Sequence, residues 1–239
     1  MASPPLPSPH STDPDWRYER KFEAGGRPLA QVELIVRLHP ACFRTAFPMR
    51  HVNNVYLDQV DLRSFRIHRD GEAKRQKFRI RWYGDAYGHV AKPVLEVKRK
   101  NGIVGTKSFF ALAPFDYGPD FDFESVRRAV LERIDDPCVA EFVAGARPAL
   151  FNRYARRYLL SADKRFRLTI DSDLRFERVG GRAVGALARF EEPGVTVLEL
   201  KYAVEDDRAA DQIARSLPFR LGKYSKYLQG ISRLSGLER

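Results

Sequence analysis

The stretch Lys-Phe-Arg-Ile-Arg-Trp-Tyr at residues 77–83 alternates strictly between basic and apolar side chains. In a β-strand, successive side chains point to opposite faces, so Lys77, Arg79 and Arg81 share one face and the intervening apolar side chains share the other. Three neighbouring cations repel one another unless water or an anion screens them. The stretch therefore predicts either a basic outer face of a β-sheet or one wall of an anion-binding site.

The overall charge of the chain favours an anionic partner. Its 239 residues include 42 Lys and Arg against 31 Asp and Glu, which gives a net charge of +11 and a pI near 9.8. Such a balance is typical of proteins that meet nucleic acid, a phosphorylated small molecule, polyphosphate or an acidic membrane surface. Charge alone does not choose among these. Apolar residues make up 44% of the chain, enough for a sizeable core.

Composition also indicates the domain organisation and the compartment. Residues 1–15 are rich in Pro and Ser and predict a disordered leader, and residues 16–239 show no internal linker and predict a single domain. The chain has no apolar run long enough for a membrane span and no signal-peptide pattern, so we expect a cytoplasmic protein. Cys42 and Cys138 lack metal-type spacing and are expected to be buried free thiols in a reducing compartment.

Hydrophobic periodicity predicts an α+β fold with about eight antiparallel strands and helices inserted between them. Asn101-Gly102 is a strong hairpin signal. The expected strands cover 17–22, 52–58, 74–83, 93–100, 103–112, 150–160, 165–171 and 197–201. The expected helices cover 28–39, 62–68, 122–144 in two pieces broken at Pro137, and 207–216. The chain has neither a Rossmann-like alternation of strands and helices nor a repeat period.

A Glu-x-Lys pattern recurs in the same phase in three of these strands. The pairs are Glu19/Lys21, Glu96/Lys98 and Glu199/Lys201. Each pair alone is consistent with a cross-strand salt bridge on a solvated face. Together with the basic stretch at 77–83, however, they give most strands a charged face on which cations outnumber anions. Helices spaced to cover the apolar faces then predict an eight-stranded β-barrel with a polar, basic lumen.

A lumen of this composition suits a chain of phosphates. Arg and Lys neutralise phosphate charge from several sides, whereas carboxylates among them are useful only if they hold a divalent cation. Mg²⁺ and Mn²⁺ prefer oxygen ligands and bridge protein carboxylates to phosphate oxygens. Basic residues beside a carboxylate-held metal are the equipment of phosphoryl transfer. Nucleic acid is not expected, because the apolar side chains of residues 77–83 face away from the cations.

The order of motifs along the chain resembles the VTC domain, the catalytic module of polyphosphate polymerases in the CYTH-like triphosphate tunnel metalloenzyme superfamily. The resemblance covers about residues 16–234. The motifs that carry it are Tyr-Glu-Arg-Lys-Phe at 18–22, Asn-Asn-Val-Tyr-Leu-Asp at 53–58, Arg-Ile-Arg-Trp-Tyr-Gly at 79–84, Leu-Glu-Val-Lys at 95–98, Arg-Leu-Thr-Ile-Asp at 167–171, Val-Leu-Glu-Leu-Lys at 197–201 and Lys-Tyr-Ser-Lys-Tyr at 223–227.

The resemblance implies a tunnel barrel that transfers the γ-phosphate of ATP to pyrophosphate or polyphosphate with Mn²⁺ or Mg²⁺. Matched motif by motif, it implies phosphate-binding roles for Lys21, Arg79, Arg81, Lys98, Arg153, Arg167, Lys223 and Lys226. It implies Glu199 as the leading metal ligand, supported by Glu19, Glu96 and Asp171. To the catalytic set we add Lys201, and as further substrate-binding candidates we add Lys77, Lys107, Arg165, Tyr56 and Ser225.

Several points stay open at the level of the sequence. The superfamily's first motif has two glutamates before its lysine, whereas this chain has Arg17 at the first position, which weakens a two-glutamate metal site on that strand. Arg153 and Arg156 have opposite parity, so the pattern does not decide which of them faces the lumen. A metal-dependent triphosphatase, or a non-catalytic module that binds polyphosphate, would share most of these residues.

Overall fold

The computed structural model describes residues 17–101, 104–179 and 189–236. The leader expected at residues 1–15 and the turn after Asn101 lie outside the described residues. The described part contains twelve strands and six helices, so the predicted α+β class is confirmed. No helix in the described ranges combines the length and the apolar character that crossing a lipid bilayer requires.

One large antiparallel sheet forms the frame of the molecule. Its strand order is β12-β1-β11-β9-β8-β2-β3-β5-β6, with β10 paired to β9, while β4 and β7 form a separate small sheet. The strands are β1 (Arg17–Glu23), β2 (Arg44–Asp58), β3 (Lys74–Tyr83), β4 (Gly88–Val90), β5 (Val94–Asn101), β6 (Val104–Ala111), β7 (Phe115–Tyr117), β8 (Arg147–Leu160), β9 (Arg167–Glu177), β10 (Arg189–Glu192), β11 (Val197–Ala203) and β12 (Arg220–Gly222).

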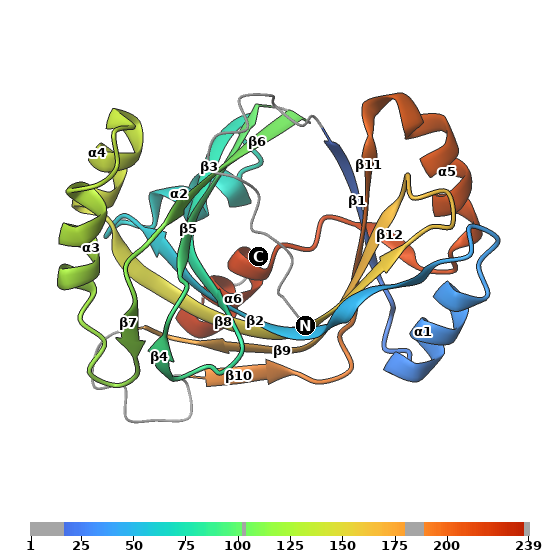
Figure 1. Cartoon of the computed structure of the whole chain (residues 1–239), viewed down its shortest axis with the longest axis horizontal. Coiled ribbons are helices and arrows are strands. Elements are labelled where there is room, and N and C mark those ends of the chain that lie inside the picture. The colour runs from blue at the N-terminus through green and yellow to red at the C-terminus, as the bar shows by residue number, and fades with distance from the viewer. Residues whose placement is uncertain (1–16, 102–103, 180–188, 237–239) are drawn as a thin grey trace.

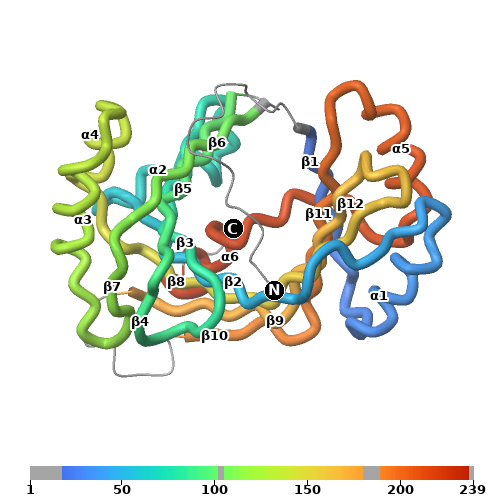
Figure 2. Tube along the Cα trace, viewed as in Figure 1, coloured from blue at the N-terminus to red at the C-terminus, as the bar shows by residue number. Residues whose placement is uncertain are grey.

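The prediction of a closed eight-stranded barrel is wrong. The sheet bends into a trough, with β2, β8 and β9 as its floor, β3, β5 and β6 as one wall and β1 and β11 as the other (Figure 1). Among the described residues no strand pairing joins β6 to β1. Part of the reason is that β12 pairs with Lys21–Glu23 and so occupies an edge of β1 that closure onto β6 would need. Figure 2 shows that β1, from the start of the chain, lies beside the late strand β11.

Four helices cover the convex side of the trough. Helices α3 (Phe123–Leu131) and α4 (Pro137–Gly145) pack on the β3–β5 wall, and α1 (Leu29–Arg37) and α5 (Asp207–Ser216) lie on the side of β1, β9 and β11 (Figure 1). Phe78, Ile80 and Trp82 are buried in the first of these two clusters. The alternation in residues 77–83 therefore places apolar side chains outward under helices and cations inward, as predicted.

The C-terminal helix α6 (Lys226–Ser235) was not predicted, and it packs against the concave side of the sheet. Tyr227 and Ile231 of α6 join a buried cluster with Leu150 and Val197, which project from the concave faces of β8 and β11. The cluster also includes Phe65 of the short helix α2 (Arg63–Arg69). The trough is therefore filled with apolar side chains where α6 lies, and only the remaining part of its inner face is polar.

Two smaller differences from the sequence-based expectations concern side-chain exposure and strand length. Cys42 and Cys138 are free thiols, but both are exposed, so the prediction that they are buried is wrong. Strand β2 begins at Arg44 rather than near residue 52, and its first residues are exposed. The exposed start of β2 lacks the apolar alternation of a half-buried strand, which is why its pattern did not predict a strand.

Candidate functional site

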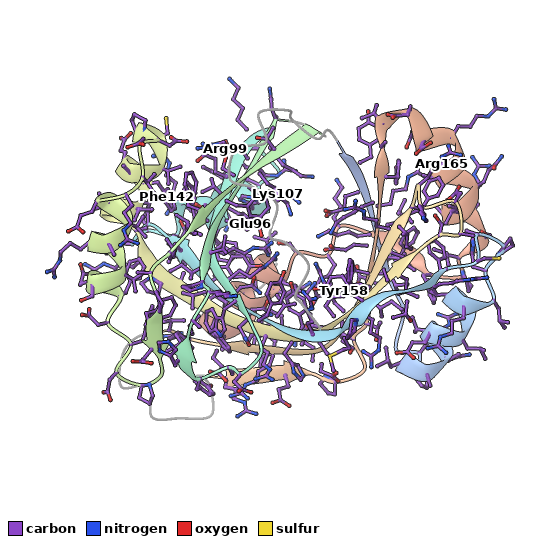
Figure 3. All side chains as sticks on the ribbon, in the orientation of Figure 1. Glu96, Arg99, Lys107, Phe142, Tyr158 and Arg165 are labelled. Carbon is purple, nitrogen blue, oxygen red and sulfur yellow. The ribbon has the colours of Figure 1, made fainter. Side chains whose placement is uncertain are left out.

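A cavity of about 170 Å³ lies on the polar part of the concave face. All three sectors of the trough and the start of α6 contribute to it. Its lining residues are Glu19, Lys21, Tyr56, Lys77, Arg79, Arg81, Lys98, Lys107, Tyr154, Arg156, Glu199, Lys201, Ser225 and Lys226. Figure 3 shows Glu96 and Lys107 pointing from β5 and β6 into the space enclosed by the trough.

The strand register explains why these side chains meet. Residues directly opposite each other on paired strands project from the same face. Lys21 pairs with Glu199 across β1 and β11, and Arg79 pairs with Glu96 across β3 and β5. In each Glu-x-Lys motif, the Glu and the Lys are paired with residues that project from the concave face. The three motifs therefore lie on one face of the sheet.

Glu96 is the buried centre of the β3–β5–β6 wall. Its carboxylate is 0% exposed and lies 2.6 Å from Arg79, 3.0 Å from Arg81 and 3.1 Å from Lys107. Burial alone would raise the pKa of Glu96, but the two arginines and Lys107 hold it well below its usual range. Because Glu96 is enclosed by three cations, it acts as their counter-ion and is poorly placed to bind a metal.

Glu19 and Glu199 lie on the opposite wall, on either side of Lys21. The Nζ atom of Lys21 is 3.4 Å from Glu19 and 3.3 Å from Glu199, and Lys201 is 3.0 Å from Glu199. Lys98 of β5 reaches across the open side of the trough to within 3.6 Å of Glu19. Burial opposes ionisation of Glu199, but Lys201, Lys21 and Arg156 keep its pKa well below the ordinary value. Burial also opposes ionisation of Glu19, but Lys21, Lys98 and Lys201 lower its pKa, so both carboxylates are ionised at neutral pH.

The floor of the cavity is built around Asp171, which is fully buried. Arg156 grips its two oxygens at 2.6 and 2.7 Å, and Lys226 of α6 lies 2.5 Å away. Arg156 also lies 3.4 Å from Glu199. Asp171 does not line the cavity itself, and it positions the two cations that do. This arrangement leaves it poorly placed to ligate a metal, the supporting role that the resemblance implied.

Of two further lining residues, the sequence pattern left Arg156 undecided against Arg153 and did not indicate Tyr154. The parity of β8 puts both on the concave face, and Arg156 lies opposite Asp171 in the ladder with β9. The ring of Tyr154 lies beneath the Lys226 ammonium at 4.5 Å, and the Arg156 guanidinium is 5.2 Å from it. Burial would raise the pKa of Tyr154, but Arg156 and Arg81 outweigh burial and lower it.

The positive charges of two lysines on the β3–β5 wall are not fully balanced by carboxylates. Lys77 donates to the Ser225 hydroxyl at 2.9 Å and lies 5.9 Å from the Tyr227 ring, and none of the ion pairs among the described residues includes it. Burial, with Lys21 and Lys98 nearby, holds the pKa of Lys77 well below its ordinary value. Burial also lowers the pKa of Lys98, to about 7, although Glu19 opposes the shift. The cavity therefore has an excess of positive charge that an anion would relieve.

Besides the buried carboxylates Glu96 and Asp171, four predicted phosphate-binding and substrate-binding residues are not among those that line the cavity. Arg153 has the opposite parity to Tyr154 on β8, and Lys223 lies in the connection between β12 and α6. Arg167 is exposed at the start of β9, opposite Lys201 in the ladder. Arg165 donates to Asp206 and lies well away from the cavity (Figure 3). The remaining predicted phosphate-binding and substrate-binding residues all line it.

The carboxylates of the cavity fit a metal only together with phosphate. Within the described ranges, no group of three or more His, Cys, Asp and Glu side chains is arranged to hold a metal ion. Glu19 and Glu199 nevertheless flank one lysine and both line the cavity. Mg²⁺ commonly takes only one or two protein carboxylates and completes its shell with water and phosphate oxygens. The donor set fits a divalent cation that arrives with a polyphosphate substrate.

Comparisons with known proteins agree with this geometry. The family model of the VTC domain matches residues 17–235. No curated protein matches the chain by sequence. A solved structure from Vibrio parahaemolyticus, described as a "putative adenylate cyclase", has a TM-score of 0.51 at 11% identity and covers 91% of this chain and 99% of its own. A second protein so described, from Bacillus halodurans, has a TM-score of 0.50 at 12% identity and covers 89% and 95%.

At these identities the two solved structures show a shared fold. The family model is more specific, because it spans nearly all of the described residues and includes every strand that lines the cavity. The resemblance inferred from the order of motifs is thereby confirmed. The protein belongs to the VTC domain family.

Proposed function

We propose that the protein is a polyphosphate polymerase, which transfers the γ-phosphate of ATP to the end of a polyphosphate chain. The observation that supports this most strongly is the convergence of cations from both walls and the floor on one cavity that also contains two ionised carboxylates, Glu19 and Glu199. A triphosphate needs charge neutralisation from several directions at once. An open sheet with scattered cations would not provide it.

Residues at different positions around the cavity have different roles in phosphoryl transfer. Arg79, Arg81 and Lys107 bind phosphate oxygens on one wall, and Arg156 and Lys226 bind them from the floor. A terminal oxygen of the acceptor chain attacks the γ-phosphorus while the bond to the β–γ bridging oxygen breaks. ADP leaves, and the chain is longer by one phosphate. The side chains act by alignment and by neutralising charge, which dominate the catalysis of this reaction.

A divalent cation, Mn²⁺ or Mg²⁺, completes the proposed site. Glu199 would hold it, with Glu19 in support, and it would supply further neutralisation of the phosphate oxygens. Lys21, between the two carboxylates, keeps both ionised and oriented when no cation is bound.

The direct test is incubation of the purified protein with ATP and Mn²⁺ or Mg²⁺, followed by separation of the products on a gel stained for polyphosphate. We expect metal-dependent accumulation of chains longer than three phosphates. Free phosphate without chains would instead identify a triphosphatase that uses water as acceptor. If tripolyphosphate raises the thermal stability of the protein but no product forms, the protein is a polyphosphate-binding module.

A further inference from the structure

A cluster of three aromatic rings, two exposed and one half-buried, surrounds Arg50 on the concave side of the trough. We call it the aromatic shelf, and it consists of Phe47, Tyr83, Tyr158 and Arg50. The Arg50 guanidinium lies 5.9 Å from the Phe47 ring centroid, 5.6 Å from that of Tyr83 and 5.9 Å from that of Tyr158. Phe47 is 42% exposed and Tyr83 is 43% exposed, so both rings are accessible to solvent.

The aromatic shelf continues the lining of the cavity. Tyr83 follows the cavity residue Arg81 by two positions on the same face of β3, and Tyr158 follows Arg156 in the same way on β8. Two residues of a strand span roughly 7 Å. Arg50 lies directly opposite Arg156 in the β2–β8 ladder. Figure 3 shows Tyr158 on the concave side, above the floor strands.

The chemistry of the aromatic shelf suits a planar ring. None of the ion pairs among the described residues includes Arg50, whose guanidinium instead lies near three π faces. Accessible aromatic rings beside an arginine are the platform on which proteins stack nucleobases, and such stacking tolerates different bases because every base has a π face. An occupant that stacks here would have its attached phosphates directed along β3 and β8 towards Arg81 and Arg156.

We propose that the aromatic shelf binds the base of the nucleoside triphosphate whose phosphates occupy the cavity. This inference rests on the proposed function, because it assumes that the cavity binds a triphosphate. It adds that the base is held at the end of the site beyond Arg81 and Arg156, by stacking rather than by base-specific hydrogen bonds. The larger purine rings are therefore expected to bind more tightly than pyrimidines, with little discrimination between adenine and guanine.

The test compares two ligands that differ in having a base. Dissociation constants for ATP and for tripolyphosphate are measured by calorimetry with the wild-type protein and with Tyr83→Leu, Tyr158→Leu and Arg50→Gln. We expect the ratio of the ATP constant to the tripolyphosphate constant to rise by at least about fivefold in the two tyrosine variants. Because tripolyphosphate has no base, its constant should change much less than that of ATP.

Tyr87→Leu serves as the matched control. Tyr87 is also about half exposed and also has an arginine, Arg175, 5.8 Å from its ring, but its ring packs on Tyr117 and Phe151 of the convex cluster. The ATP-to-tripolyphosphate ratio should stay at the wild-type value in this variant. Thermal unfolding without ligand establishes that each variant is folded before its constants are compared.

A second measurement reports contact between the protein and the base directly. Saturation transferred from the protein to the adenine protons of ATP in NMR should be strong with the wild-type protein and weak with Tyr158→Leu. If tripolyphosphate binds but the ratio and the transfer are unchanged in the tyrosine variants, the inference is wrong and the proposed function is untouched. If tripolyphosphate does not bind the wild-type protein, the proposed function fails first and the inference falls with it.

Discussion

The two walls of the cavity contain the same residue types, Lys or Arg and Glu, but differ in the ratio of cations to carboxylates. The β3–β5–β6 wall has a single carboxylate, Glu96, which contacts Arg79, Arg81 and Lys107. Of its two further cations, Lys77 donates to Ser225 and Lys98 lies near Glu19 of the opposite wall. On the β1–β11 wall, Lys21 and Lys201 alternate with Glu19 and Glu199. One wall therefore carries a large excess of positive charge, and the other is close to neutral.

This difference indicates what each wall can bind. A carboxylate enclosed by three cations holds their side chains in place and leaves their outer donors for phosphate. Carboxylates that alternate with lysines on a partly open wall are still available to a divalent cation, which would replace the ammonium groups as their counter-ion. The sequence motif Glu-x-Lys is the same in both cases. Its role depends on which strands lie next to it.

The largest effect is expected from Glu96→Gln, which tests the structural role of the positive wall. The substitution leaves Arg79, Arg81 and Lys107 without their shared buried counter-ion. Removing one partner of a buried ion pair commonly costs about 3–5 kcal/mol in the free energy of unfolding. Urea unfolding followed by circular dichroism measures this free energy. A variant as stable as the wild type would show that Glu96 is not the counter-ion that stabilises the positive wall.

Glu199→Gln tests the other wall, where the main loss should be in activity. We expect metal-dependent turnover of ATP to fall by about a hundredfold or more, because the substitution removes the carboxylate that we propose as the leading metal ligand. The dissociation constant for tripolyphosphate without metal should change by only a few-fold, since no phosphate-binding cation is removed. Full activity in this variant would exclude Glu199 as the metal ligand.

Lys77→Met tests whether a lysine without a carboxylate partner destabilises the free protein and contributes to phosphate binding. Lys77 is half-buried, with hydroxyl and aromatic neighbours but no carboxylate, so Met should raise the midpoint of thermal unfolding without ligand. Each kcal/mol gained corresponds to about 2–4 °C in a chain of this size. The same substitution should weaken tripolyphosphate binding roughly tenfold. A stabilised variant with unchanged binding would remove Lys77 from the site.

Lys98 makes both the free energy of unfolding and the binding of tripolyphosphate depend on pH. Its pKa of about 7 in the folded protein lies below the ordinary 10.5, so between about pH 7 and 10.5 the unfolded chain binds more protons. The contribution of Lys98 therefore makes the free energy of unfolding rise with pH across that window. A bound polyanion favours the charged lysine, so tripolyphosphate binding at pH 8 should take up protons.

Proton uptake is measured by calorimetry in two buffers of different ionisation enthalpy. The uptake should shrink in Lys98→Met, which keeps most of the side-chain volume and loses the titrating group. Equal uptake in the variant and the wild type would show that another group in the cavity titrates instead.

The smallest effect is expected from Arg165→Gln, a control on the outer surface. Arg165 pairs with Asp206 rather than facing either wall. Tripolyphosphate binding and turnover should match the wild type, with at most a small shift in the thermal midpoint. Lost binding in this variant would restore Arg165 to the phosphate-binding set that the sequence predicted.

The parts of the site that the sequence predicted are those that local alternation determines. Strands β1, β3, β5 and β11 each contain charged residues at every second position, so their inner faces followed directly from period two. Strand β8 contains arginines of both parities, and only pairing with Asp171 on β9 identifies Arg156 as the inner one. That information lies in a long-range contact, which no local pattern contains.

Closure of the sheet could not be predicted for a similar reason. The presence of an open trough rather than a barrel depends on which strand occupies the last edge, and β12 is only three residues long. For α6 a local signal did exist. Ser225 caps a helix in which Tyr227, Ile231 and Leu234 recur at helical spacing, but the same residues were interpreted only as part of the Lys-Tyr-Ser-Lys-Tyr motif.

The placement of β1 beside β11 and β12 has a consequence for how the molecule assembles. Lys21 donates to the carbonyl of Tyr224, 203 residues further along the chain. Contacts between such distant segments require closure of a very long loop, which slows folding. We therefore expect refolding to be slow and late intermediates to lack a competent cavity. A short polyphosphate that binds only the finished structure should then retard unfolding more than it accelerates refolding.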